Sequence, residues 1–198
     1  GSFEMLPGRT LANLLDREGA LPEPVWLALA EELLNVVVRA SARKGLEPNF
    51  HPSSISVWRW SRKRFVVAFG AYAFDVSDNR ADLWQRWDRW TASLNALLYF
   101  MATGDWKTDP SKIDPRGFFK NEHLRNRPAA RDVLEQLFDP EKEEAPKLED
   151  YRFLLSMAAE KIQGSFQHFV EDHLCSLPTD DPRIPWMLSE HHLPIEVQ

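Results

Sequence analysis

Hydrophobic positions with helical spacing cover most of the stretch between Ala81 and Gly104. It contains no Pro and no internal Gly, and it is long enough for about six helical turns. Trp84, Trp87 and Trp90 recur at every third position, and Leu and Met then cover most of the circumference. Gly104 suits a left-handed C-terminal cap. The pattern predicts a buried central helix around which the other elements pack.

Two helices are predicted before this central helix. Thr10 is a suitable N-cap for a short helix that has leucines on one face and ends at Gly19. Pro24 fits the first turn of a longer helix, because its missing N–H would have no partner there. Leucine and valine cover almost the whole circumference of this second helix. We therefore expect it to be buried against the central one.

Strand periodicity is found only between the second and the central helix. Ile55–Trp58 alternates with a period of two, and Arg64–Phe69 is a second extended apolar run. Polar residues between them predict a β-hairpin with a loop of about five residues. Residues 45–54 are predicted to be an irregular loop, and residues 71–80 a short connection into the central helix.

The second half of the chain has weaker local signals. Residues 105–127 lack periodicity and are predicted to be a loop with about one short helical turn, after which Pro128 begins a helix that runs to Phe138. Residues 139–147 are acidic and predict an exposed linker. A long amphipathic helix is predicted over 148–177, with a break at Gly164 as an alternative, and the four Pro of 178–198 predict an extended tail.

Composition is consistent with a single folded unit. The chain has 198 residues, of which 43% are hydrophobic, 27% are charged and eight are Trp. We expect a mainly α-helical protein with one small β-hairpin, in which residues 1–138 form the principal domain. Residues 139–198, with the linker, the long helix and the tail, are expected to pack on the same domain.

Charge and cysteine content limit the functional classes. A net charge of -6 opposes general binding to nucleic acids or anionic membranes, which both require a basic surface. The basic residues of 59–64 could hold a small anion, although a solvated hairpin tip explains them more simply. No apolar run is long enough for a membrane span. The single cysteine, Cys175, excludes an internal disulfide and indicates the cytoplasm, with the nucleus as an alternative.

Neither acidic residues nor histidines are spaced as a metal site. The aspartates at 75, 78, 82 and 88 lack the spacing of a calcium loop, and His191 and His192 lack further zinc ligands nearby. His51 lies beside Ser53, but neighbouring residues in an irregular loop do not give the geometry of a nucleophile and its base. We expect no metal, no cofactor and no catalytic residue of these kinds.

The order of these elements resembles the C-terminal lobe of eukaryotic-type protein kinases over about Pro7–Phe138. HPSSISV at His51–Val57 is similar to the K-P-x-N-I-L-x end of the kinase catalytic loop, and Ala68-Phe69-Gly70 stands where D-F-G would be. Leu97–Gly104 resembles the end of the central helix of that lobe, and Arg127-Pro128 resembles the R-P that opens a later helix. The resemblance implies a kinase C-lobe-like helical domain.

Three departures from the kinase pattern imply that this chain does not transfer phosphate. On the resemblance, the catalytic Asp, the Mg²⁺-binding Asn and the D-F-G Asp fall near Asn49, Ser54 and Ala68. Asn49 cannot act as a base, Ser54 is a poorer metal ligand, and Ala68 has no side-chain oxygen. The residues before Leu6 are too few for an N-lobe with its glycine-rich loop and lysine. The resemblance therefore implies a non-enzymatic C-lobe without an N-lobe.

The opening TLANLLDREGALPEPVWLAL is similar to the L-x-x-x-L…G-x-L-x-E-x-x-W-A-L start of the kinase non-catalytic C-lobe domain, or KIND domain. Trp26 stands in the place of its tryptophan. That family binds a peptide segment of a partner protein, and a pseudokinase fragment is the alternative membership.

We therefore expect a non-catalytic scaffold or adaptor module that binds a peptide or helix of another protein. The alternative is a residual nucleotide or anion binder, or the C-lobe of a split kinase-like enzyme completed by another chain. A homodimer through residues 148–177 is a further expectation. The aromatic side chains that could reach a partner are Trp84, Trp87, Trp106, Phe118 and Phe119. For the tryptophans, packing in the core is the competing interpretation.

Overall fold

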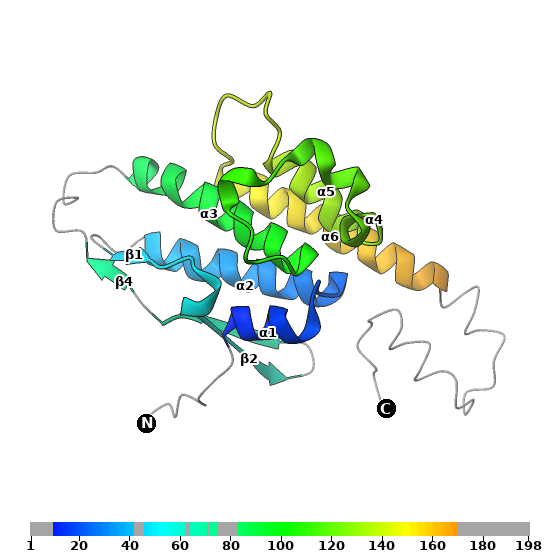
Figure 1. Ribbon diagram of the computed structural model, residues 1–198, viewed down its shortest axis with the longest axis horizontal. Helices are drawn as coiled ribbons and strands as arrows, with labels where there is room; N and C mark the ends of the chain where they lie inside the picture. Colours follow the sequence, from blue (N-terminus) through cyan, green and yellow to red (C-terminus); the bar gives the residue numbers. More distant parts are fainter. Residues whose placement is uncertain (1–9, 42–45, 62–63, 71, 75–82, 170–198) are drawn as a thin grey trace.

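The computed structural model describes residues 10–41, 46–61, 64–70, 72–74 and 83–169 (Figure 1). The protein is mainly helical, as predicted, with a small β-hairpin on one side. Its longer helices are α1 (Leu11–Glu18), α2 (Glu23–Ser41), α3 (Leu83–Thr103), α5 (Pro128–Leu137) and α6 (Leu148–Phe169). In Figure 1, α2 lies between α3, α5 and α6 on one side and α1 and the hairpin on the other.

The predicted helix ends are confirmed. The Thr10 side chain accepts a hydrogen bond from the backbone N–H of Asn13 at 3.1 Å and caps α1. Gly19 ends this helix at φ 69°, and Gly104 follows α3 at φ 78°. The central helix therefore ends where its sequence indicates, whereas its predicted start at Ala81 lies outside the described residues.

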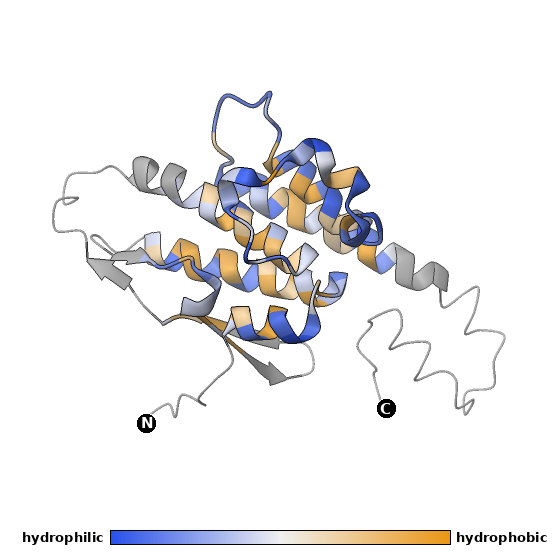
Figure 2. Cartoon of the chain, in the orientation of Figure 1, coloured by the Kyte–Doolittle hydropathy of each residue, from blue (hydrophilic) through white to orange (hydrophobic). Residues whose placement is uncertain are grey.

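The core forms where α2 and α3 meet. Trp26, Leu29 and Leu33 of α2 are buried, as are Leu94 and Met101 of α3. Figure 2 shows hydrophobic residues concentrated where these helices face each other and face α5 and α6. The prediction that the second helix is buried against the central one is confirmed.

The predicted hairpin consists of β2 (Ile55–Ser61) and β3 (Arg64–Phe69), which pair antiparallel with Ile55 opposite Phe69. Only residues 62–63 separate the two strands, so the predicted five-residue loop is too long. A second antiparallel pair joins β1 (Leu46–Pro48) to β4 (Tyr72–Phe74). The prediction that residues 45–54 are irregular was wrong at β1, because three-residue strands are too short to show a period of two.

Residues 105–127 also contain more helix than predicted. They form the 3₁₀ helices η3 (Pro110–Lys112) and η4 (Pro115–Lys120) and the short helix α4 (Glu122–Arg125). Asp109 and Asp114 cap the two 3₁₀ helices, each with a proline directly after it, and the Asn121 side chain caps α4. A similar turn, η1 (Pro52–Ser54), begins after His51.

The acidic segment 139–147 runs over the surface into α6, as expected. α6 packs against α2 and α5 and passes Gly164 without a break. Its face away from the core exposes Phe153 (63%) and Met157 (50%). Residues 170–198, with the rest of the predicted helix and the tail, lie outside the described part, and the homodimer stays a prediction. No helix among the described residues is long and apolar enough to cross a bilayer.

Candidate functional site

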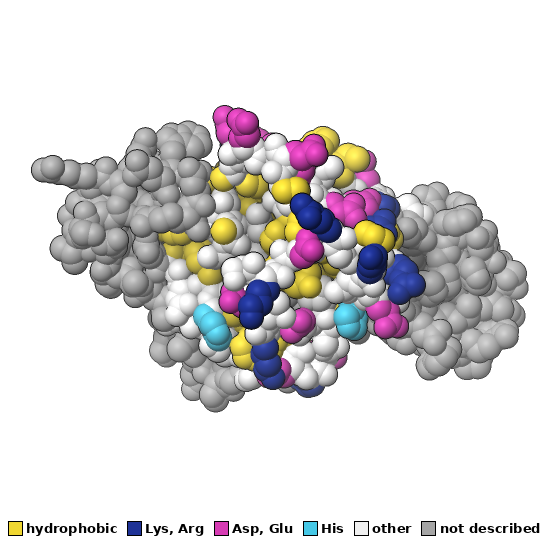
Figure 3. Space-filling view, turned by 45° about the horizontal axis from the view of Figure 1, so that its top comes forward, with side chains coloured by type: hydrophobic (Ala, Val, Ile, Leu, Met, Phe, Trp, Pro, Cys, Tyr) yellow, Lys and Arg dark blue, Asp and Glu magenta, His cyan; other side chains and the backbone are white. Residues whose placement is uncertain are grey.

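A groove of about 840 Å³ lies beside the middle of α3. One bank is the segment 48–52, and the opposite bank is the segment 106–110. The floor is formed by Trp90, Ala92, Ser93, Ala96 and Phe100 of α3. We call this site the α3 groove. Figure 3 shows acidic and basic side chains interspersed with hydrophobic ones over the part of the surface that is described.

The floor of the α3 groove is mostly apolar and belongs to a helix. Ala92, Ser93 and Ala96 have small side chains, so a ligand can approach the helix closely between the larger rings at its ends. Trp90 and Phe100 are buried. Phe50, from the first bank, packs with a ring-centroid distance of 6.2 Å to Trp90. The floor is therefore set by the packing of α3 rather than by a loop.

Trp106 forms the wall of the second bank and is held from three sides. Its indole N–H donates to a carboxylate oxygen of Asp16 in α1 at 2.9 Å. The His51 ring, on the opposite bank, meets it edge to face with 5.8 Å between centroids. The ammonium of Lys107 lies 5.4 Å from its centroid. A partly buried tryptophan fixed in this way is a preorganised contact surface.

The Asp16 carboxylate makes this anchor charge-assisted. The hydrogen bond from Trp106 lowers the pKa of Asp16, and the Lys107 ammonium, 3.3 Å from the same oxygen, lowers it further. Asp16 is therefore ionised at neutral pH, and an ionised acceptor strengthens the bond from the indole. The helix α1 thus contributes to the groove without lining it.

Local hydrogen bonds define the first bank. The Asn49 side-chain oxygen accepts from the backbone N–H of His51 at 2.9 Å. The His51 ring nitrogen Nδ1 accepts from the backbone N–H of Ser53 at 3.2 Å and lies 2.6 Å from its hydroxyl oxygen. These contacts begin η1, so the closeness of His51 and Ser53 is that of a helix cap.

The predicted contact residues are dispersed rather than gathered at one surface. Trp106 lies in the α3 groove. Phe119 is 60% exposed, with the ammonium of Lys120 at 5.4 Å from its ring, and is not part of the groove lining. Trp84 belongs to the first turn of α3, and its side chain lies outside the described part.

Two of the predicted contact residues are buried. Trp87 is 8% exposed and donates its indole N–H to the carbonyl oxygen of Pro146 at 2.9 Å. Phe118 is 2% exposed and stacks on Tyr99 with centroids 5.5 Å apart. The expectation that Phe118 is an exposed contact is wrong, because η4 turns this side chain into the core. Neither residue can offer contact area to a partner without local rearrangement.

The three degenerate kinase positions do not form one cluster through any contact among the described residues. Asn49 is exposed on the first bank of the α3 groove. The Ser54 carbonyl accepts from the backbone N–H of Gly70 at 2.7 Å, which brings it close to the end of β3. Ala68 pairs with Ser56 in the hairpin. The basic side chains of 59–64 lie outside the described part.

No group of three or more His, Cys, Asp or Glu side chains that could hold a metal ion occurs among the described residues. Sequence reasoning missed Phe50, His51 and Trp90 as groove residues. The signal that could have found them is the pair of proline-containing segments, 48–52 and 106–110, each with an aromatic side chain, on either side of the central helix.

Comparison with known proteins found no matching family model, no matching curated protein and no matching solved structure. The resemblance to a kinase C-lobe and to the KIND domain therefore stays a prediction from the sequence. The α3 groove is described from this structure alone.

Proposed function

We propose that this protein is a non-catalytic interaction module that binds an extended peptide of a partner protein in the α3 groove. The observation that supports this function is the groove itself. It has an apolar floor on a buried helix and an aromatic wall, Trp106, that contacts from α1 and from the opposite bank hold in place. Binding to a preformed surface of this kind requires little ordering of the protein.

The lining favours a proline-containing peptide. Grooves lined with aromatic rings recognise peptides in the polyproline II conformation, which is already ordered before binding. Phe50, His51 and Trp106 supply such rings here. Trp90 and Phe100 are buried and form the base beneath them. The small side chains of Ala92 and Ala96 leave room on the floor between them. A proline ring could pack there against the face of Trp106.

The alternative function, a residual nucleotide or anion site or a split kinase-like enzyme, has no comparable support in the described residues. The Asn49 amide oxygen already accepts a backbone hydrogen bond. The basic residues 59–64 that suggested an anion site have side chains outside the described part. This function stays an alternative that nucleotide-binding measurements can test.

The experiment is a selection from a phage-displayed library of dodecapeptides that each contain two prolines. The dissociation constants of selected peptides are then measured by fluorescence anisotropy for the wild type and for two groove variants. Trp106→Ala removes the wall, and Ser93→Arg fills the floor. We expect each to weaken binding at least about tenfold, because a central tryptophan commonly dominates the energy of an interface.

The matched control is Phe119→Ala, which removes an aromatic ring that is exposed but lies outside the groove. We expect it to bind the peptides as the wild type does. Circular dichroism and urea unfolding establish that each variant is folded. If the library yields no binder, or if folded Trp106→Ala and Ser93→Arg proteins bind as tightly as the wild type, the proposed function is wrong.

A further inference from the structure

The chain itself contains a segment with the chemistry that suits the α3 groove. Pro182-Arg183-Ile184-Pro185 is a P-x-x-P sequence, and Trp186, Met187 and Leu188 follow it directly. A polyproline II helix has three residues per turn, so its two prolines lie on the same side. Such sequences are the usual ligands of aromatic-lined grooves. The segment 182–188 is also the most apolar part of the chain after α6.

We propose that the segment 182–188 of this chain occupies the α3 groove and competes there with the peptide of a partner. This inference rests on the proposed function, because it uses the same groove. It adds a regulatory consequence, since a partner must displace the segment before it can bind.

The chain is long enough for this arrangement. The Tyr151 hydroxyl, near the start of α6, contacts Asn95 and the carbonyl oxygen of Thr91, which are neighbours of the groove floor in α3. From Tyr151, α6 extends about 27 Å to Phe169. The roughly 17 residues from Phe169 to Trp186 span up to about 56 Å when extended. The segment must span the length of α6 back to Tyr151 and then the 10–12 Å diameter of α3. The extended chain is longer than the sum of these two distances.

The charges at the groove are compatible with this segment. Asp109 lies on the second bank and is exposed, and hydrogen bonds from the backbone and side chain of Ser111 lower its pKa. The segment carries one cation, Arg183, between its two prolines. Lys107, the cation on the same bank, is already paired with Asp16. An ion pair between Arg183 and Asp109 would set the direction in which the segment lies.

Covalent attachment makes a weak contact effective. A tethered ligand has an effective concentration that reaches the millimolar range for a short flexible linker. Where this concentration is about ten times the intrinsic dissociation constant, the segment lowers the apparent affinity of a competing peptide about tenfold. Removal of the contact should raise the apparent affinity for the competing peptide by the same factor.

The test compares the full chain with the double variant Pro185→Ala/Trp186→Ala, using a selected library peptide as the probe. We expect the double variant to bind the probe about tenfold more tightly than the wild type. Leu193→Ala/Pro194→Ala, which changes an apolar residue and a proline further along the tail, is the matched control and should bind as the wild type does. Equal affinity of the wild type and the Pro185→Ala/Trp186→Ala protein would overturn the inference and leave the proposed function intact.

A second measurement uses a labelled synthetic peptide of residues 180–190. We expect it to bind the Pro185→Ala/Trp186→Ala protein and to lose this binding when Trp106→Ala is added. If it binds while no library peptide does, the groove holds the tail alone: the proposed function and the competition with a partner are overturned, and only the occupancy of the groove by the segment is supported. If the affinity of the wild type for the probe rises on dilution and light scattering shows a dimer, the segment occupies the groove of a second copy. The intramolecular arrangement is then overturned.

Discussion

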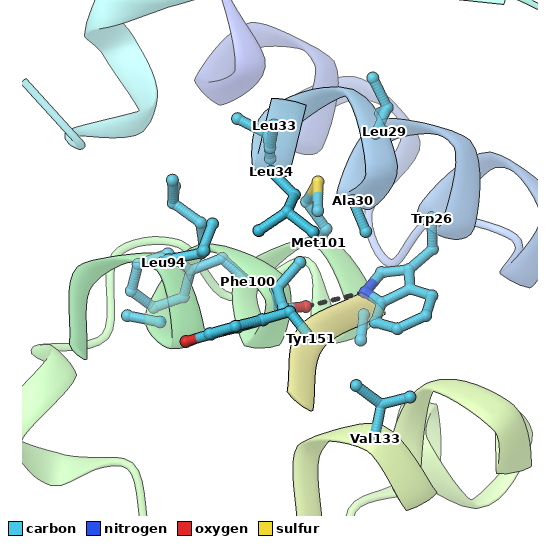
Figure 4. Packing of buried hydrophobic residues seen from close by; sticks show 14 of the residues in the cluster. Trp26, Leu29, Ala30, Leu33, Leu34, Leu94, Phe100, Met101, Val133 and Tyr151 are labelled. Atoms are coloured by element: carbon cyan, nitrogen blue, oxygen red, sulfur yellow. Dashed lines mark hydrogen bonds between the residues drawn. The ribbon is translucent and has the colours of Figure 1, made fainter. Parts of the chain in front are cut away.

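Trp26 donates its indole N–H to the backbone carbonyl oxygen of Leu98 at 2.9 Å, and both side chains are buried (Figure 4). The two residues are 72 positions apart and join α2 to α3. A buried indole N–H needs an acceptor, and this one lies on the backbone of the central helix. The bond therefore favours one orientation of α2 against α3, in addition to the apolar contacts around it.

We expect Trp26→Phe to lower the free energy of unfolding by about 2–4 kcal/mol, because the change removes the hydrogen bond and leaves a cavity. Urea unfolding measures it. The matched control is Trp106→Phe, since this indole also donates a hydrogen bond but is only partly buried, and its acceptor, Asp16, is exposed to solvent. We expect the control to lose less than about 1 kcal/mol. Equal losses would show that the buried hydrogen bond contributes no more to stability than the partly exposed one.

A second buried polar contact joins α6 to α3. The Tyr151 hydroxyl donates to the side-chain oxygen of Asn95, and the Asn95 amide donates to the carbonyl oxygen of Leu137 at 3.3 Å. We expect Tyr151→Phe to cost about 1–3 kcal/mol in urea unfolding, because the buried Asn95 oxygen loses this donor. Tyr99→Phe is the control at a half-buried tyrosine and should cost less. A smaller loss for Tyr151→Phe than for Tyr99→Phe would contradict this.

The same tyrosine should couple stability to alkaline pH. Burial raises the pKa of Tyr151 far above its ordinary value, and the nearby Asp150 carboxylate raises it further. In the unfolded chain the hydroxyl titrates at about pH 10. Above that pH the unfolded state releases a proton that the folded state retains, so stability falls as the pH rises. Urea midpoints measured across this range should fall less steeply for Tyr151→Phe than for the wild type, and parallel curves would exclude the coupling.

Glu23 of α2 caps a helix far from it in sequence. One of its carboxylate oxygens accepts from the backbone N–H groups of Ala129 and Ala130, at 2.6 and 3.1 Å, in the first turn of α5. The N-cap residue itself, Arg127, makes no side-chain cap bond, and its guanidinium instead donates to the carbonyl oxygens of Ala20 and Leu21. Two sets of hydrogen bonds thus join the start of α2 to the start of α5, one accepted by Glu23 and one donated by Arg127.

Desolvation raises the pKa of Glu23, although the two backbone hydrogen bonds and Arg127 oppose this shift. Between its unfolded and folded pKa values the folded state binds more protons, so this group's contribution to stability is lost as the pH rises through the folded pKa. Glu23→Gln should remove that pH dependence and keep an acceptor for α5. Glu23→Ala removes the acceptor as well and should cost about 1 kcal/mol in urea unfolding below the unfolded-state pKa of Glu23, with a smaller cost as the pH rises. A pH dependence that is unchanged in Glu23→Gln would assign it to another group.

The sequence predicts the helices better than the site. The limits of the central helix follow from local signals, namely apolar spacing from Trp84 to Met101 and the glycine at 104. The pairing of Leu46 with Phe74 joins residues far apart in the sequence. Its strands have only three residues each, so no periodic pattern predicts them. The cap of α5 by Glu23 is likewise a contact over more than a hundred positions.

The α3 groove could be predicted only in part. Trp106 could be predicted as a contact residue, because it lies in the segment without periodicity that follows Gly104. The opposite bank could not be predicted, because the hydrogen bonds that place His51 depend on the fold of the 48–52 segment. Phe118 and Phe119 are adjacent aromatic residues, and only the turn of η4 decides that the first is buried and the second exposed.

Gly19 and Gly104, which both have a positive φ, offer a test that separates backbone strain from close packing. A Cβ atom on Gly104 would lie 2.6 Å from the backbone nitrogen of Ala20 and 2.7 Å from the carbonyl carbon of Gly19, whereas a Cβ atom on Gly19 would meet no atom within 4 Å. We expect Gly19→Ala to cost about 1–3 kcal/mol from backbone strain alone. Gly104→Ala should cost about 1–3 kcal/mol more, because the end of α3 must move away from the turn before α2.

Urea unfolding of the two variants gives this difference directly. The distinction matters for the α3 groove, because Gly104 immediately precedes the 105–110 segment that carries Trp106. Gly104→Ala should therefore also weaken the binding of a selected peptide, while Gly19→Ala, at the end of α1, should do so much less. If both variants lose the same stability and the same affinity, the contact between Gly104 and the Gly19–Ala20 turn does not position the bank.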